Sequence, residues 1–289
     1  MNKRFIEKII EAAIFISGIT AILIVVLIFV FLLKESFFFF VRENMFAVLL
    51  GKNWYPISDP PKFGFLPLML GSLFVTAGAI MIAVPFGLAA AIYISEVAPI
   101  WLRDILKTGI ELLAAIPSIV LGFIGIVVLA PIIKNVFHLG SGLTALAGSI
   151  MLAFMAMPTI VSIIEDAITS VPRSYKQGAL ALGATHWQTI HRVIIPAAFP
   201  GIIAAVMLGI GRVIGETMAV LMITGNAAIM PTSLLQPVRT LTATIAAEMG
   251  EVIRGSTHYY ALFGIGLILF IITFMINLIA DLVLHRRRI

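Results

Sequence analysis

The chain has 289 residues, of which 61% are hydrophobic and only 11% are charged, and its mean hydropathy is +1.13. Soluble globular proteins carry about 25% charged and about 45–50% apolar residues, so a soluble domain and a disordered chain are both excluded. Long apolar runs also disfavour a β-barrel, whose strands alternate. The composition predicts an all-α polytopic membrane protein. The chain has no cysteine, which excludes disulfides and Cys-based metal sites.

The first apolar run follows Lys3, Arg4 and Lys8, as the apolar region of a signal peptide would. It covers 12–33, however, and the apolar region of a secretory signal is about 7–15 residues long. No small-residue cleavage site follows it. The run therefore predicts a retained first membrane helix.

Six uncharged stretches each exceed the roughly 18 residues that indicate a spanning helix. Arg212 and Glu216 interrupt the fifth, for which we expect one helix over about 200–224. The stretches are 12–33, 63–95, 112–133, 135–164, 193–211 and 255–280.

Loop charges predict the orientation, because cytoplasmic loops are enriched in Lys and Arg. The loops on the side of the N-terminus contain 11 Lys and Arg residues, against 7 on the other side. We expect both termini to be cytoplasmic in the plasma (inner) membrane, with Arg286–Arg288 anchoring the last helix at the headgroups. We divide the chain into 1–66, a first helix with an outer loop, and 67–285, a core of five helices.

Motifs for chemistry within this chain are absent. No phosphate-binding G-x-x-x-x-G-K-[ST] loop occurs. Gly209, Gly211 and Gly215 do not have dinucleotide-fingerprint spacing, and we interpret Gly211 and Gly215 as a small-residue helix contact. The five histidines form no metal-ligand pattern. We expect neither an enzyme nor a nucleic-acid partner, since basic loops explain the net charge of +5.

The predicted cytoplasmic loop 165–196 is not a plain polar linker. It reads as a short helix, a turn at Gly183–Ala184 and a second helix, with Pro196 at the start of the next span. Such a protrusion could lie on the membrane or insert into a groove of a partner, and the residues favour neither.

Within this loop, Gln177-Gly178-Ala179 through Gly183, continuing as Val193-Ile-Ile-Pro196, resembles the EAA loop of ABC-importer permeases. Ala179, Gly183 and Pro196 are in register, whereas Gln177 and Gly178 depart from Glu-Ala. The resemblance implies a type I ABC-importer permease fold, in which this loop is a coupling helix that docks into a separate ATPase subunit. ATP and Mg would be bound by that subunit, and no cofactor by this chain.

Arg212 lies near the middle of the predicted fifth helix, and Glu216 follows at i+4 on the same face. A charge at this depth costs from about 3 to over 10 kcal/mol. Either the two residues neutralise each other and fix helix packing, or they line a pathway for a charged solute. Arginine favours an oxyanion, because its planar fork donates two parallel hydrogen bonds.

The stretch from Gly209 to Val220, with Gly225-Asn226 after it, resembles phosphate-importer permeases of the PstC type. So do the stretches 237–251 and 116–123. This resemblance implies a phosphate pathway with alternating access, a homologous PstA-type permease, an ATPase dimer and an extracytoplasmic phosphate-binding protein. The alternatives are a permease for sulfate or molybdate, or a secondary transporter.

Several further residues carry expectations with an equally plausible structural role. Ser118 and Thr217 are expected near the pathway, or bonded to a carbonyl of their own helix. Pro85 and Pro117 would kink apolar spans. A short amphipathic helix is expected at 240–249, in an outer loop where four charged residues either dock a binding protein or are simply solvated: Arg239, Glu248, Glu251 and Arg254.

Overall fold

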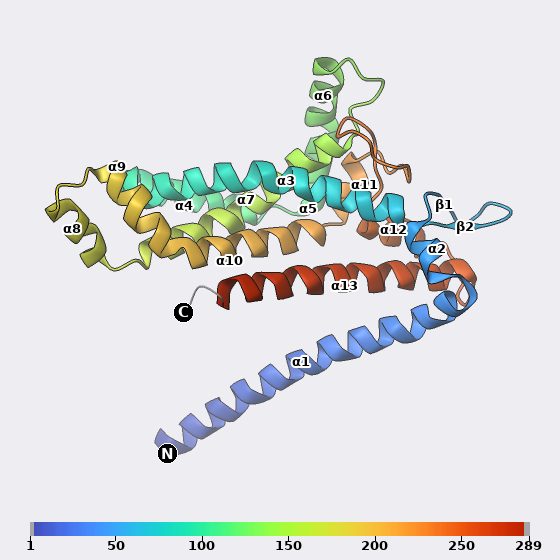
Figure 1. Cartoon of the computed structure of the whole chain (residues 1–289), viewed down its shortest axis with the longest axis horizontal. Coiled ribbons are helices and arrows are strands. Elements are labelled where there is room, and N and C mark those ends of the chain that lie inside the picture. The colour runs from blue at the N-terminus through green and yellow to red at the C-terminus, as the bar shows by residue number, and fades with distance from the viewer. Residues whose placement is uncertain (1–2, 286–289) are drawn as a thin grey trace.

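The computed structural model describes residues 3–285 and is an elongated helical bundle (Figure 1). The expected anchor Arg286–Arg288 lies outside the described residues. The elements, in chain order, are α1 (Lys3–Arg42), α2 (Met45–Leu50), β1 (Trp54–Tyr55), β2 (Lys62–Phe63), α3 (Leu66–Ile92), η1 (Tyr93–Val97), α4 (Ile100–Ala114), α5 (Ser118–Ile124), η2 (Gly125–Leu129), α6 (Ala130–Val136), α7 (Ala145–Thr169), α8 (Arg173–Ala181), α9 (His186–Thr189), η3 (Ile190–Ile194), α10 (Ile195–Ile214), α11 (Met218–Ile223), α12 (Leu241–Glu248) and α13 (Thr257–His285). The η elements are single turns of π-helix inside longer helices, and β1 pairs with β2 in an antiparallel hairpin.

Six helices within residues 3–285 are long and apolar enough to cross a membrane, as predicted. They are Ile10–Arg42, Leu66–Val97, Ser118–Val136, Ala145–Thr169, His186–Ile214 and Thr257–Ile279. The third begins later than expected, because Pro117 does not kink a span but separates α4 from α5. The fourth begins at Ala145, where Thr144 caps the helix by accepting a hydrogen bond from the amide of Ala147.

Helix α7 is the centre of the bundle. In the most apolar 18-residue stretch of α7, 67% of the residues are buried, whereas in the corresponding stretch of each of the other five spans 28% or less are buried. It packs between α3 and α10, and small residues permit the close approach. A Cβ at Gly87 of α3 or at Gly209 of α10 would collide with the side chain of Ile160. The segment of α10 that carries Arg212, discussed below, therefore packs on a tightly packed core.

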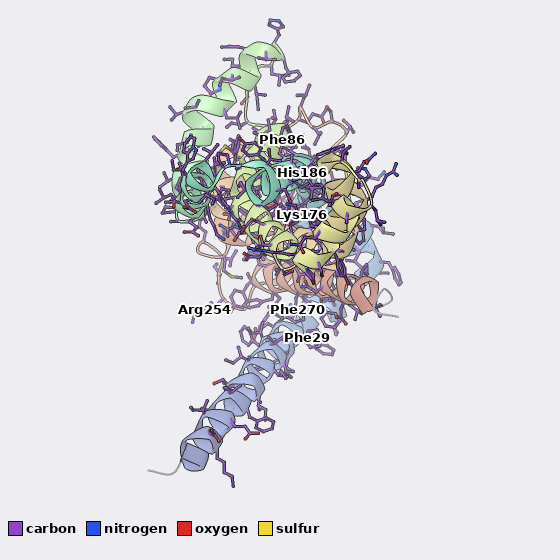
Figure 2. All side chains as sticks on the ribbon, turned by 90° about the vertical axis from the view of Figure 1, so that its left-hand side faces the viewer. Phe29, Phe86, Lys176, His186, Arg254 and Phe270 are labelled. Atoms are coloured by element: carbon purple, nitrogen blue, oxygen red, sulfur yellow. The ribbon has the colours of Figure 1, made fainter. Side chains whose placement is uncertain are left out.

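Helix α1 stands apart from this core and packs along α13 (Figure 1). Phe29 stacks near Phe270 with ring centroids 5.3 Å apart, and the two residues lie together in the end view of Figure 2. The C-terminal end of α1 inserts Phe39 into a buried aromatic cluster with Trp54, Phe63 and Phe65.

The two ends of the molecule differ in character. Helices α8 and α9 lie at one end, together with the first turns of α1 and the last turns of α13, as an even number of spans requires (Figure 1). The hairpin, α2 and the end of α12 lie at the other end.

The segment 96–111, which was expected to be a loop, contains most of helix α4. Glu165 joins α4 to α7, because its buried carboxylate pairs with both Arg103 and Lys107 of α4.

Candidate functional site

A break in the fifth span corrects the prediction of one helix over 200–224. Helix α10 ends at Ile214, and α11 begins at Met218. The carboxylate of Glu216 causes the restart: its Oε1 accepts hydrogen bonds from the amides of Thr217 (3.0 Å), Met218 (3.1 Å) and Ala219 (3.3 Å). A short acidic side chain that satisfies these free amides stabilises a helix start at this point.

Arg212 does not pair with Glu216, so the mutual neutralisation that was one of the two alternatives does not occur within this chain. Its Nη1 donates to Oγ1 of Thr159 on α7 at 3.3 Å, and no ion pair in residues 3–285 includes Arg212 or Glu216. Thr159 lies near the middle of the 25-residue α7, so Arg212 is close to mid-membrane depth. The residue is exposed on the surface of this single chain.

Ser118 is brought to the level of the break by the packing of α5 against α11. Gly122 faces Ala219 and Met222, while Gly125 faces Ile223, so the two helices run parallel. Ser118, one turn before Gly122, therefore lies beside the start of α11. The hydroxyl of Thr217 bonds to the carbonyl of Gly215 at 3.3 Å, the local bond that was the alternative to a pathway role.

Sequence reasoning missed two partners of the break. Thr159 contacts Arg212, and Thr242 of α12 donates from its hydroxyl to the carbonyl of Glu216 at 2.8 Å. Neither residue had a distinguishing sequence signal, since threonines in apolar helices usually bond to their own backbone.

The helix contact expected at Gly211 has no partner in the described chain, because a Cβ there would meet no atom within 4 Å. Gly211 and Arg212 thus belong to one open surface.

The loop 165–196 forms the predicted helix, turn and helix. Gly183 adopts φ +84, which only glycine and a few polar residues tolerate, and Thr185 and Gln188 form a capping box at α9. Pro196 is the second residue of α10, directly after the π-turn η3. Gln177, Gly178, Gly183 and Pro196 are exposed, and Ala179 is half-buried.

Large apolar side chains project from this loop, which lies at the end of the molecule facing the reader in Figure 2. Tyr175 is 54%, Leu182 90% and Trp187 63% exposed. Tyr175 and Leu182 line a groove of about 420 Å³, together with Gly178 and Ala179. The loop therefore presents an apolar, hollowed surface suited to a protein partner.

At the same end, Lys107 on α4 donates to Glu165 at 2.9 Å. This hydrogen bond raises the pKa of the Lys107 ammonium above its ordinary value, against the opposing effect of its partial burial. The ion pair thus stays intact throughout the physiological range and holds α4 on α7.

The helix expected at 240–249 is α12, but its first residues, Leu241 to Thr244, are buried and do not form a surface. Two of the four charged residues expected there also turn inward. Glu248 accepts hydrogen bonds from Arg239 (2.5 Å) and from the indole of Trp54 (3.1 Å), and it lies 2.8 Å from His258. Glu251 and Arg254 remain exposed, and Arg254 points away from the bundle in Figure 2.

No group of three His, Asp or Glu side chains that could hold a metal occurs among the described residues. The candidate site residues lie in two places: at the break after Ile214, which Arg212 precedes, and in the loop 165–196.

Known proteins resemble this chain closely in sequence. It is 44% identical over 241 residues to the probable ABC transporter permease protein YqgH of Bacillus subtilis, covering 83% of this chain and 78% of that protein. It is 40% identical over 260 residues to the phosphate transport system permease protein PstC of Mesorhizobium japonicum, covering 83% and 79%.

Solved structures show the fold. An inward-facing MetNI methionine ABC transporter chain matches with a TM-score of 0.62 and 20% identity, over 80% of this chain and 99% of that one. A chain of a bacterial ABC transporter involved in alginate import matches with a TM-score of 0.66 and 14% identity, over 99% of both chains. The expected importer-permease fold is confirmed.

The family described as binding-protein-dependent transport system inner membrane component matches residues 83–289. This family consists of transport subunits, so the expectation of a non-enzymatic permease with a separate ATPase is confirmed, and a secondary transporter is disfavoured. Since the match covers most of the chain, the protein belongs to the family of inner membrane components of binding-protein-dependent transport systems.

Proposed function

We propose that the chain is a permease subunit of an ATP-driven phosphate importer, and that the surface around Arg212 lines the phosphate pathway. The observation that carries the proposal is the exposed guanidinium of Arg212 on a membrane-spanning helix, with a single threonine hydrogen bond and no carboxylate partner in the described chain. Facing lipid, such a charge would cost about 3 kcal/mol or more. A polar pathway shared with a second permease subunit removes that cost.

The interrupted backbone supports the same location. Non-helical backbone at membrane depth is tolerated only where it is buried in protein or lines a water-filled cavity. Gly215 is exposed, and Glu216 and Thr217 are half-buried, so the break has one open side. Ser118 would contribute its hydroxyl from the neighbouring helix, while Glu216 acts as the structural cap that keeps the break in place.

Phosphate is the favoured substrate because relatives that are 34–40% identical to this chain are named phosphate transport permeases. An arginine fork also suits the tetrahedral oxyanion. Sulfate or molybdate would satisfy the same donor, and they form the alternative.

The docking residues are proposed from the exposed loop. Gln177, Gly178, Ala179 and Gly183 would seat in a cleft of the ATPase, and Pro196 would begin the helix that leads away from it. A homologous PstA-type permease would complete the pathway, an ATPase dimer would bind the loop, and a phosphate-binding protein would dock at the opposite, outer end.

This arrangement makes both termini cytoplasmic, as the loop charges favour. Residues 67–285 would be the transport core and 1–66 an accessory helix with an outer loop, which is supported by the family match over 83–289.

The test is reconstitution of the complex in liposomes with ATP inside and the binding protein outside. We expect ATP-dependent uptake of phosphate and not of sulfate. Arg212→Gln should lower phosphate uptake about tenfold or more, since loss of one charged hydrogen bond costs about 1.5–3 kcal/mol. Co-purification of the ATPase with the variant controls for assembly. Wild-type uptake rates in Arg212→Gln would remove Arg212 from the pathway, and uptake of sulfate alone would overturn the substrate.

A further inference from the structure

Glu96 joins the end of α3 to both helices of the loop 165–196. It lies in the π-turn η1, and its side chain is only 11% exposed. Its Oε2 accepts a hydrogen bond from Nζ of Lys176 on α8 at 2.5 Å, and Nε2 of His186 on α9 lies 3.9 Å from the same oxygen. Figure 2 shows Lys176 and His186 near each other at the end that faces the reader.

Burial and hydrogen bonds fix the backbone around Glu96. Ile94, two residues before it, is buried in the main core, and Ser95 bonds to the carbonyls of Ala91 and Ile92. The amide of Ala98 donates to the carbonyl of Tyr93 and closes the turn. Glu96 is therefore a fixed point on α3, whereas Lys176 is carried by the protruding helix that follows Pro172.

This pair differs from an ordinary surface salt bridge. Exposed ion pairs contribute little to stability, because water screens their attraction and because pairing restricts the conformations of two long side chains. Here the acid is almost enclosed, and the side chain of Lys176 is 35% exposed. Removing Lys176 would leave the enclosed carboxylate of Glu96 without a compensating charge, so the two side chains favour the paired geometry.

Helix α3 also reaches the break at mid-membrane. The hydroxyl of its Ser72 accepts a hydrogen bond from the amide of Leu241 at 2.9 Å, and the next residue, Thr242, bonds to the carbonyl of Glu216. Displacement of the loop can thus reach the break along α3 as well as along α10, which follows the loop in the chain.

We propose that Glu96 is a positioning residue for energy coupling: its carboxylate fastens α8 and α9 to α3, so that movement of the loop moves α3 with it. The proposal rests on the proposed docking of the ATPase at this loop. Lys176 directly precedes Gln177 in the chain, which places the fastening beside the proposed docking surface.

The first experiment measures phosphate uptake per ATP hydrolysed in the reconstituted complex. In Glu96→Gln the ATPase should still co-purify, while uptake per ATP falls about threefold to tenfold, the size of effect typical of altered coupling between sites. The reversed pair, Glu96→Lys with Lys176→Glu, should restore most of the ratio, whereas Glu96→Lys alone should not. Asp104→Asn, an exposed carboxylate on α4 at the same end, is the matched control and should leave the ratio unchanged.

The second experiment measures the fastening without transport. The chain has no cysteine, so spin labels at Ser174→Cys on α8 and Ile100→Cys at the start of α4 have no background from this chain. In the assembled complex, the distance distribution between the labels should broaden in Glu96→Gln and narrow again in the reversed pair.

The outcomes separate the two proposals. Unchanged distances and an unchanged uptake-to-ATP ratio in Glu96→Gln would overturn the role of Glu96. Failure of the reversed pair to recover either quantity would also overturn it, since the contact would then not depend on opposite charges. Broadened distances in a complex whose wild type does not import phosphate would support the fastening and overturn the proposed substrate.

Discussion

Arg212 on α10 donates a hydrogen bond to Thr159 on α7, with 3.3 Å between Nη1 and Oγ1. This single neutral contact orients a guanidinium that remains exposed on the surface of the chain. Because the partner is a hydroxyl and not a carboxylate, the full positive charge of Arg212 is available to an anion. A carboxylate in the same place would compete with the substrate.

Replacing Thr159 tests this contact. Thr159→Val keeps the shape of the side chain and removes the acceptor, so the guanidinium loses its orientation. A hydrogen bond to a charged group contributes about 1.5–3 kcal/mol at most, and we expect phosphate uptake to fall about fivefold to tenfold. Thr159→Ser keeps the hydroxyl and should transport nearly as wild type. Equal rates in the valine and serine variants would show that the contact has no part in transport.

Two substitutions of Glu216 distinguish its role as a helix cap from a role of its negative charge. Glu216→Gln retains a carbonyl oxygen that can accept from the amides of Thr217, Met218 and Ala219, whereas Glu216→Ala removes it. Loss of such a cap costs about 1 kcal/mol. Hydrogen exchange at these three amides should rise strongly in the alanine variant and little in the glutamine variant. If both variants lose uptake and protection equally, the charge and not the cap is what matters.

Glu248 should be a major contributor to stability at the outer end. In Glu248→Gln the Arg239 side chain, which is 20% exposed, loses its carboxylate partner, and the loss of a hydrogen bond to a charged group costs about 1.5–3 kcal/mol. The loss can be measured as a lower unfolding free energy in detergent titration, followed by tryptophan fluorescence. Glu251→Gln, an exposed neighbour, should change stability by no more than about 0.5 kcal/mol. Similar values for the two variants would contradict the network.

Gly183 sets the angle between α8 and α9. An alanine there must adopt φ +84, which costs about 1–2 kcal/mol. Gly183→Ala should therefore weaken co-purification of the ATPase and increase proteolysis of the loop, and Gly183→Asn should have a smaller effect because asparagine tolerates this conformation. Gly109→Ala, in the middle of α4 with open space around it, is the control and should behave as wild type. Undiminished co-purification with Gly183→Ala would show that the loop geometry is not needed for docking.

Hydropathy and turn chemistry predicted most of the architecture. The six spans follow from apolar length alone, and the turn at Gly183 follows from a residue type that favours positive φ. Both signals are local, so neighbouring residues determine them without tertiary information.

The break after Ile214 could not be predicted from hydropathy, because residues on both sides of it are apolar and helix-forming. The second helix starts where the carboxylate of Glu216 accepts hydrogen bonds from the three amides that follow it. Thr242, more than twenty residues later in the chain, donates to the carbonyl of Glu216. The same holds for Arg239 and Glu248, which an outer loop was expected to expose. Glu248 also accepts from Trp54, which lies 194 residues away in the chain, so that only the fold brings these two residues together.

The span from His186 to Ile214 is one helical run of 29 residues, interrupted only by the π-turn η3. At 1.5 Å per residue it is about 40 Å long. It begins in the loop proposed to receive the ATPase and ends two residues after Arg212. Although η3 and Pro200 can bend this run, it is continuous, so a displacement of its first turns in the loop 165–196 would be carried along one helix to the segment that holds Arg212.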